Sequence, residues 1–162
     1  MWVVAKIKSD QCFIFKQELR SKFGDQVEYY EPKIYHQKKS FDNEKKILGN
    51  YIFCFHEKFK DNKYLIESRY TKGLKYFLNG CKNSQKEIVD FINFCKKNQN
   101  HRGHLTQSFF QHINLKKAQF INGPLANIVF EIVSNQKKYL NVILGKRKIK
   151  IEKNLNFIYL PA

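Results

Sequence analysis

A central β-strand is predicted by the stretch WVVAKI at Trp2–Ile7, which is apolar and rich in β-branched residues. Downstream, residues 11–23 repeat apolar side chains at steps of three and four, which is the spacing of one face of an amphipathic helix. Gly24 stands where such a helix commonly ends. Together these segments predict a sheet with a helix packed against it.

A second helix is predicted by Ser84–Glu87, where Ser and Glu have the spacing of a capping box. The apolar residues that follow share one helical face, so we expect a helix from about Gln85 to Lys97. Residues 36–46 are polar and charged without a period, which predicts an exposed hairpin loop. We expect further strands at 27–35, 51–56 and 74–78, and a short helix that is capped by Asp61 or Asn62 and ends at Arg69.

The C-terminal third has a different pattern. Residues 98–112 show no period and contain Gly103 among polar residues, which is typical of a linker. Short β-prone runs separated by turn residues follow at 119–121, 128–133, 139–144, 149–152 and 157–159, and they indicate a small barrel. We therefore predict an α+β fold with an N-terminal antiparallel sheet covered by helices (1–98), a linker (99–112) and a small all-β SH3-like barrel (113–162).

Composition narrows the setting in which the chain works. It has 30 Lys and Arg against 14 Asp and Glu, and a formal net charge of +16 favours polyanionic surroundings. Most of these cations are Lys, which an AT-rich coding sequence also produces, so the charge indicates work near nucleic acid rather than sequence-specific readout. The cysteines show no paired spacing, and neither a secretory leader nor a membrane-length apolar run is evident. We expect a monomer in a reducing cytoplasm.

Four short motifs are spread along the chain in a fixed order. They are Trp2-Val3-Val4, Leu48-Gly49-Asn50-Tyr51-Ile52-Phe53, Thr71-Lys72-Gly73-Leu74 and Asn122-Gly123-Pro124-Leu125. In this order and spacing they resemble the NusG/RfaH family of bacterial transcription elongation and antitermination factors. That family joins an NGN domain, which grips RNA polymerase, to a barrel with a KOW motif. The resemblance implies a binding factor that modulates pausing, termination and antitermination, with no catalytic site and no cofactor.

The resemblance also implies a docking surface for the clamp helices of the polymerase's largest subunit. Carried over by position, this surface comprises Trp2, Leu48, Tyr51 and Phe53. Aromatic side chains suit such a hot spot because they offer a large rigid area at little entropic cost. The alternative is that these side chains simply pack the core. Tyr51 and Phe53 share one face of their strand while Ile52 and Cys54 share the other, so we expect at most one of the two sets to be core.

Two further surfaces follow from the resemblance. Arg69, Thr71 and Lys72 would face the polymerase gate and upstream DNA, where the two cations either contact the non-template strand or remain solvated. Gly73 would permit the tight turn from helix to strand. In the barrel, one turn carries Lys146, Arg147, Lys148 and Lys150, which either contact nascent or ribosomal RNA or form ordinary solvated surface. The barrel would recruit a small-subunit ribosomal protein or Rho.

Other classes of function fit the sequence less well. Cys95, His101 and His104 lack a CxxC partner and a complete ligand set, so a linker with incidental histidines is favoured over a zinc site. We find no recognisable spacing of nucleophile and base and no P-loop, which argues against an enzyme. Three alternatives stay open: a housekeeping NusG, a specialised RfaH-like antiterminator, and a KOW-containing RNA-binding or ribosome-associated accessory protein.

Overall fold

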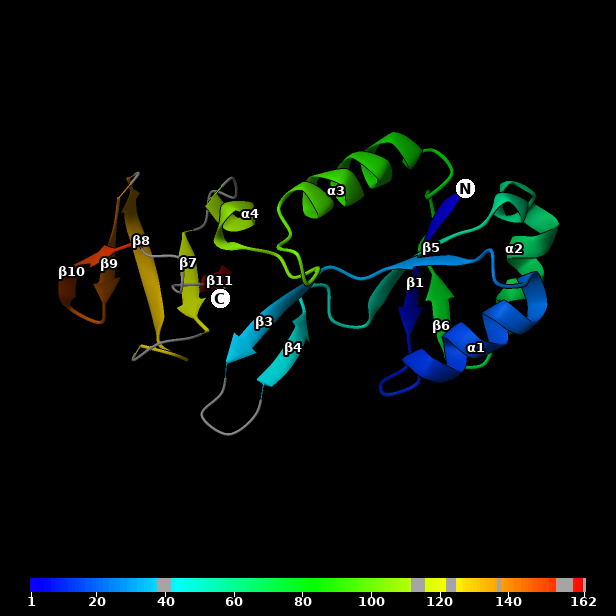
Figure 1. Ribbon diagram of the computed structural model, residues 1–162, viewed down its shortest axis with the longest axis horizontal. Coiled ribbons are helices and arrows are strands. Elements are labelled where there is room, and N and C mark those ends of the chain that lie inside the picture. Colours follow the sequence, from blue (N-terminus) through cyan, green and yellow to red (C-terminus); the bar gives the residue numbers. More distant parts are fainter. Residues whose placement is uncertain (38–41, 112–115, 122–124, 137, 154–158, 162) are drawn as a thin grey trace. The chain divides into compact units, whose positions relative to one another are not determined.

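The computed structural model describes residues 1–37, 42–111, 116–121, 125–136, 138–153 and 159–161. The chain divides into two compact units, which are seen in Figure 1. The first comprises residues 1–33 and 46–97, and the second comprises residues 34–45 and 98–162. The predicted fold class is confirmed, because an antiparallel sheet with helices is followed by a C-terminal all-β region.

The first unit is built on a four-stranded antiparallel sheet in the order β2-β5-β1-β6. The strand predicted from WVVAKI is β1, and it lies between β5 and β6 as a central strand should. The elements of this unit are β1 (Trp2–Ile7), α1 (Cys12–Phe23), β2 (Glu28–Tyr30), β5 (Tyr51–Phe55), the 3-10 helix η1 (Glu57–Lys60), α2 (Asn62–Ser68), β6 (Leu74–Phe77) and α3 (Gln85–Lys97).

Helices cover both faces of this sheet, with α3 on one side and α1 on the other (Figure 1). The side chains that α1 turns inward include Phe15 and Leu19, both buried. From α3, Phe91 packs against Phe53 of β5, with ring centroids 5.7 Å apart. α3 has the predicted bounds, and α2 is capped by Asp61, whose Oδ1 accepts a hydrogen bond from the backbone N–H of the second helical residue.

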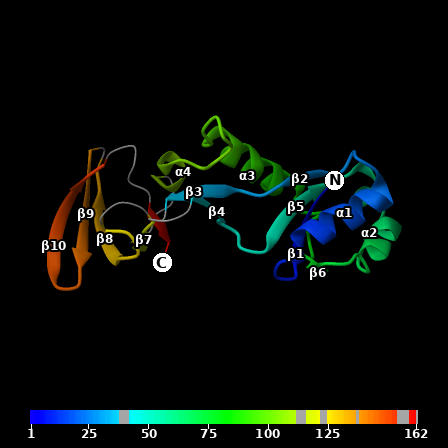
Figure 2. The ribbon, with the colours of Figure 1, turned by 60° about the horizontal axis from the view of Figure 1, so that its bottom comes forward.

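The second unit contains a five-stranded antiparallel sheet in the order β10-β9-β8-β7-β11. Figure 2 shows β10, β9, β8 and β7 of this sheet side by side. The rings of Phe120 and Phe130 stack at 4.1 Å in its core, and Tyr159 meets both edge-on. Of the motif at 122–125 that resembles the NusG/RfaH family, only Leu125 lies within the described residues. The strands are β7 (Lys117–Phe120), β8 (Val129–Asn135), β9 (Tyr139–Leu144), β10 (Arg147–Glu152) and β11 (Tyr159–Pro161).

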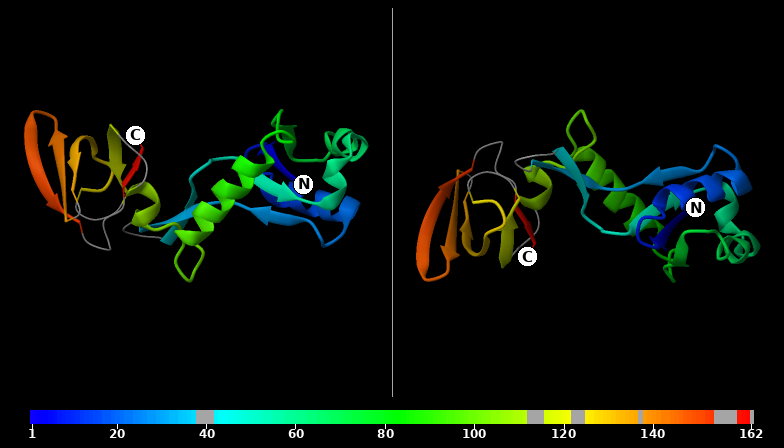
Figure 3. Two further views of the ribbon diagram at one scale, coloured as in Figure 1. Left: turned by 90° about the horizontal axis from the view of Figure 1, so that it is seen from above. Right: turned by 90° about the horizontal axis from the view of Figure 1, so that it is seen from below.

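A hairpin, apart from its first and last residues, and a short helix also belong to this unit (Figure 3). The hairpin consists of β3 (Lys33–Gln37) and β4 (Asp42–Lys46), and the helix is α4 (Gln107–Gln111). The segment before α4 contacts the hairpin, because His104 Nε2 lies 2.9 Å from Glu44 Oε1 of β4. Residues 34–45 and 98–112 are thus grouped with the C-terminal sheet, which the sequence did not predict. No helix within the described ranges has the length and apolar character to cross a membrane.

Candidate protein-docking surface

Three side chains from neighbouring strands form a row across the sheet of the first unit. Lys6 of β1 is opposite Tyr51 of β5 on one side and opposite Tyr76 of β6 on the other. Directly opposed residues of antiparallel strands point to the same face. The Lys6 Nζ lies 3.9 Å from the centre of the Tyr51 ring, and the two tyrosine hydroxyls are 3.3 Å apart. We call these three residues the tyrosine–lysine row.

The row forms an accessible end of a sheet face that is otherwise covered. Further along the same face, Phe53 is only 6% exposed, and it lies between Tyr30 of β2 and Phe91 of α3. In the row itself, Tyr76 is 43% exposed, and Tyr51 is half-buried. The row therefore combines ordered aromatic side chains with accessible surface, and this combination suits interface anchors.

The row presents hydrogen-bond donors and a positive charge. The hydrogen bond with the Tyr51 hydroxyl raises the pKa of Tyr76 above its usual value, although Lys6 and Lys75 act in the opposite direction. Tyr76 is therefore neutral at physiological pH. Within the described part of the chain, no carboxylate forms an ion pair with Lys6.

The other residues predicted for clamp binding lie around this face. The backbone of Trp2 is held by Gln85 of α3, whose Nε2 donates to the Trp2 carbonyl at 2.7 Å and whose Oε1 accepts from its N–H at 2.9 Å. Leu48 stands in the turn before β5 and packs partly against the core. The expectation that only one face of β5 is core is wrong. Ile52, Phe53 and Cys54 are all buried, because helices cover both faces of the sheet. The assignment of Phe53 to the docking surface stays a prediction.

The residues predicted to face the polymerase gate lie on the connection from α2 to β6. Arg69 and Lys72 are exposed, and Lys72 Nζ lies 3.6 Å from Glu18 Oε1 of α1. Thr71, in contrast, is buried, and its Oγ1 accepts a hydrogen bond from Lys22 Nζ at 3.2 Å. Thr71 thus anchors the connection to α1, while the two cations face solvent.

Gly73 closes this connection against α1. Its φ of +81° lies in the left-handed region that L side chains rarely adopt, as the predicted tight turn requires. A Cβ at this position would lie 2.7 Å from the carbonyl oxygen of Gln11 and 3.0 Å from Phe15 Cβ. Both the backbone conformation and the close approach of α1 therefore demand glycine here.

The four cations predicted in the barrel lie in the second unit, on the β9–β10 turn and on β10. Lys146, Arg147, Lys148 and Lys150 are all exposed. The ammonium of Lys150 lies 3.9 Å from the centre of the Tyr139 ring. A hollow of about 290 Å³ adjoins them and is lined by Val133, Ser134, Asn141, Val142, Lys148, Ile149 and Lys150. No carboxylate in the described ranges pairs with these four cations.

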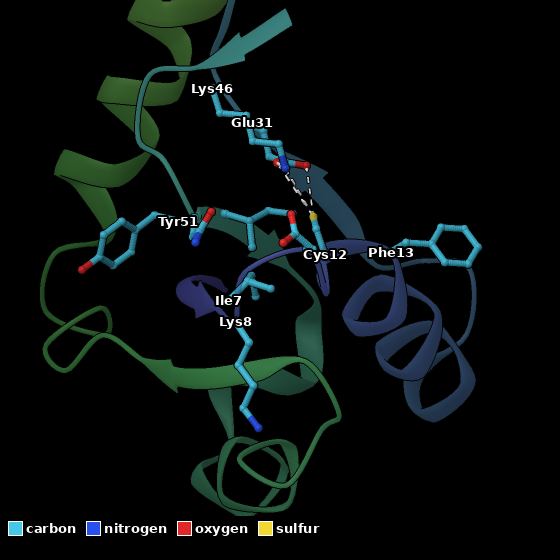
Figure 4. A pocket seen from close by; sticks show the side chains of 10 residues that line it. Ile7, Lys8, Cys12, Phe13, Glu31, Lys46 and Tyr51 are labelled. Carbon is cyan, nitrogen blue, oxygen red and sulfur yellow. Dashed lines mark hydrogen bonds and ion pairs between the residues drawn. The ribbon is translucent and has the colours of Figure 1, made fainter.

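A separate pocket of about 270 Å³ opens in the first unit beside Glu31 and Lys46 (Figure 4). Its wall carries Glu31, which accepts hydrogen bonds from Lys16 Nζ at 2.5 Å and from Lys46 Nζ. Burial raises the pKa of the Glu31 carboxyl, but the two lysines outweigh burial and lower it overall. Lys46 Nζ also lies 3.5 Å from Cys12 Sγ. These groups satisfy one another, and Figure 4 shows the Tyr51 ring turned away from them.

The zinc alternative gains no support from the geometry. Cys95 is buried in α3 of the first unit, whereas His101 and His104 belong to the second. The described ranges hold no group of three or more His, Cys, Asp or Glu side chains arranged to bind a metal ion.

Lys6 and Tyr76 were not among the residues predicted from the sequence. Lys6 is the single charged residue of WVVAKI, and an isolated lysine in a central strand is a usable signal. Tyr76 gives no such signal, because only the pairing of β1 with β6 brings it beside Lys6.

Comparison with known proteins gives structural likenesses only. No protein-family model and no curated protein matches the chain. The solved structures that resemble it include the MjSpt4:Spt5 complex in conformation B, with a TM-score of 0.30, 11% identity, and coverage of 100% of this chain and 98% of that chain. Another is a structure of Thermotoga maritima NusG, with a TM-score of 0.34, 12% identity, and coverage of 95% and 93%. Likenesses at this level carry no argument about function, which has to rest on the residues described above.

Proposed function

We propose that this protein is a transcription elongation factor of the NusG family that binds RNA polymerase through the tyrosine–lysine row. The observation that carries the proposal is the placement of Tyr51. It belongs to the stretch 48–53 that resembles the family's polymerase-binding segment, and it stands at an accessible end of a face whose remainder α3 covers. A docking surface combines ordered apolar area with polar groups that can bind a partner. The row provides the area through the tyrosine rings and the polar groups through the hydroxyls and the Lys6 ammonium.

In this proposal the first unit acts by binding alone. The row contacts the clamp helices of the largest subunit, and Arg69 and Lys72 contact the gate or the non-template strand. Bridging clamp and gate favours the closed, pause-resistant enzyme, since a ligand shifts a conformational equilibrium toward the state it binds better. Arg69 and Lys72 support this role because they are exposed while Thr71 holds their backbone in place.

The second unit would supply a further contact, with a ribosomal protein, Rho or RNA. The exposed cations of the β9–β10 turn favour RNA, and they keep the second candidate open, in which the protein is a KOW-containing RNA-binding accessory factor. Within the leading proposal, a specialised RfaH-like antiterminator and a housekeeping factor share the same docking surface. They would differ in the partner of the second unit.

The test is the affinity of the full chain for purified core RNA polymerase, compared between the wild type and Tyr51→Ala. Truncation of a hot-spot tyrosine should weaken binding by about 2 kcal/mol, or roughly 30-fold. Phe13→Ala is the matched control, because Phe13 is an aromatic residue that is 77% exposed on α1, which covers the opposite face of the sheet. A wild type that does not bind polymerase would refute the proposal. If Tyr51→Ala binds polymerase as tightly as the wild type, the tyrosine–lysine row is not the docking surface.

A further inference from the structure

The row contains the Lys6 ammonium group, which forms no ion pair with any residue that the structure describes. Lys6 is half-buried between Tyr51 and Tyr76 of the two neighbouring strands, and the described residues place no carboxylate against it. Holding a cation in one place beside low-dielectric surface costs free energy that a nearby anion recovers. In the free protein, the positive charge of Lys6 is therefore not balanced by any described carboxylate.

The tyrosine hydroxyls add a donor to the same spot. With their oxygens 3.3 Å apart, one hydroxyl donates to the other, and the accepting hydroxyl keeps its own proton for an outside acceptor. The Tyr76 hydroxyl remains protonated at neutral pH, since its pKa is raised. Together with the Lys6 ammonium, which lies over the Tyr51 ring, the row thus presents several hydrogen-bond donors.

We infer that the docking partner presents a carboxylate side chain to Lys6 and the adjoining tyrosine hydroxyl. This inference rests on the proposed function, and it specifies the chemistry of the polymerase element that binds: an Asp or Glu on an otherwise apolar helical surface. Charge-assisted hydrogen bonds of this kind fix register and orientation in addition to adding affinity.

A nucleic-acid phosphate is the other anion to consider, and the geometry disfavours it. Single-stranded nucleic acid gains much of its binding energy by stacking bases on exposed aromatic faces. In the row, the Lys6 ammonium already occupies one face of the Tyr51 ring at 3.9 Å. Leu48, the first residue of the stretch 48–53 that contains Tyr51, is also partly buried. An apolar side chain at this position suits a protein partner better than a sugar–phosphate chain.

The experiment measures polymerase affinity for Lys6→Met, Lys6→Glu and Lys6→Arg in the full chain. Lys6→Met keeps the apolar stem and should weaken binding about tenfold, while Lys6→Glu should weaken it roughly 100-fold through like-charge repulsion, and Lys6→Arg should retain most of the affinity. Lys63→Glu, at an exposed lysine of α2, controls for the change in net charge. Trp2 fluorescence in urea confirms that each variant folds.

A charge exchange identifies the partner group. Single Asp→Lys or Glu→Lys changes along the polymerase clamp helices should include one that restores binding of Lys6→Glu. If the wild type binds polymerase and both Lys6→Met and Lys6→Glu bind it as tightly as the wild type, the carboxylate inference is overturned while the docking proposal stands. If the Lys6 variants instead lose single-stranded DNA binding and no exchange restores polymerase binding, the anion is a phosphate and the inference is wrong. A wild type that binds no polymerase would refute both the docking proposal and the carboxylate inference.

Discussion

Replacing Gly73 with alanine should destabilise the first unit by about 3 kcal/mol. Two structural terms contribute. A residue other than glycine at a left-handed φ of +81° costs roughly 1–2 kcal/mol. The added methyl group would also lie 2.7 Å from the Gln11 carbonyl oxygen and 3.0 Å from Phe15 Cβ, and overpacking of this kind costs about 1–3 kcal/mol.

Gly80→Ala separates these two terms. Gly80 has nearly the same φ, +80°, but a Cβ built there has no neighbour within 4 Å. It should therefore show only the backbone cost, about 1–2 kcal/mol. The gain of about 0.4–1 kcal/mol from a stiffer unfolded chain is common to both variants and cancels in the comparison.

The assay is urea unfolding followed by fluorescence of Trp2, the single tryptophan, which reports on the first unit. Gly73→Ala should lose about 1–3 kcal/mol more free energy of unfolding than Gly80→Ala, which is the overpacking cost alone. Equal losses would mean that the connection from α2 to β6 does not approach α1 as described. The reasoning about how Thr71 and Gly73 position Arg69 and Lys72 would then be refuted.

Three further predictions concern the core, an ion network and the basic turn. Phe53→Ala should lower the free energy of unfolding by about 3–5 kcal/mol because it empties space between β2 and α3, and a loss below 1 kcal/mol in the same urea assay would contradict this burial. Glu31→Gln should cost about 2 kcal/mol at pH 7 through its two lysine partners. Because the folded-state pKa of Glu31 is lowered, this difference from wild type should persist above about pH 4.5 and shrink as the pH falls through the folded-state value; a difference independent of pH would contradict the network. Neutralising Lys146, Arg147 and Lys148 together should reduce the slope of log affinity for single-stranded RNA against log salt by roughly 0.7 per lost phosphate contact, whereas an unchanged slope would make the turn ordinary surface.

Local patterns in the sequence predicted the regular elements well. The Ser84–Glu87 spacing and the apolar period after it define α3 at both ends, and Asp61 caps α2 as expected. These features depend on neighbouring residues only, so a single sequence contains them. The strand predicted at 139–144 is likewise found as β9.

Features that depend on tertiary pairing were not predicted. Strand alternation divides Ile52 from Phe53 but cannot reveal that α1 and α3 cover both faces, so the burial of both residues together was not predicted. The grouping of the β3–β4 hairpin with the second unit involves contacts such as His104 with Glu44, sixty positions apart, which no local pattern encodes. For the same reason Tyr76 was absent from the predicted docking residues.

Site-specific photo-crosslinking tests the proposed docking most directly. A benzophenone amino acid placed at Tyr76 should crosslink the full chain to the largest subunit of RNA polymerase, and the crosslinked peptide should map to the clamp helices. The same group placed at Phe13, on the helix that covers the other face of the sheet, should give no such product. Crosslinks from Tyr76 that reach only nucleic acid, or that arise equally from Phe13, would contradict binding of polymerase through the tyrosine–lysine row.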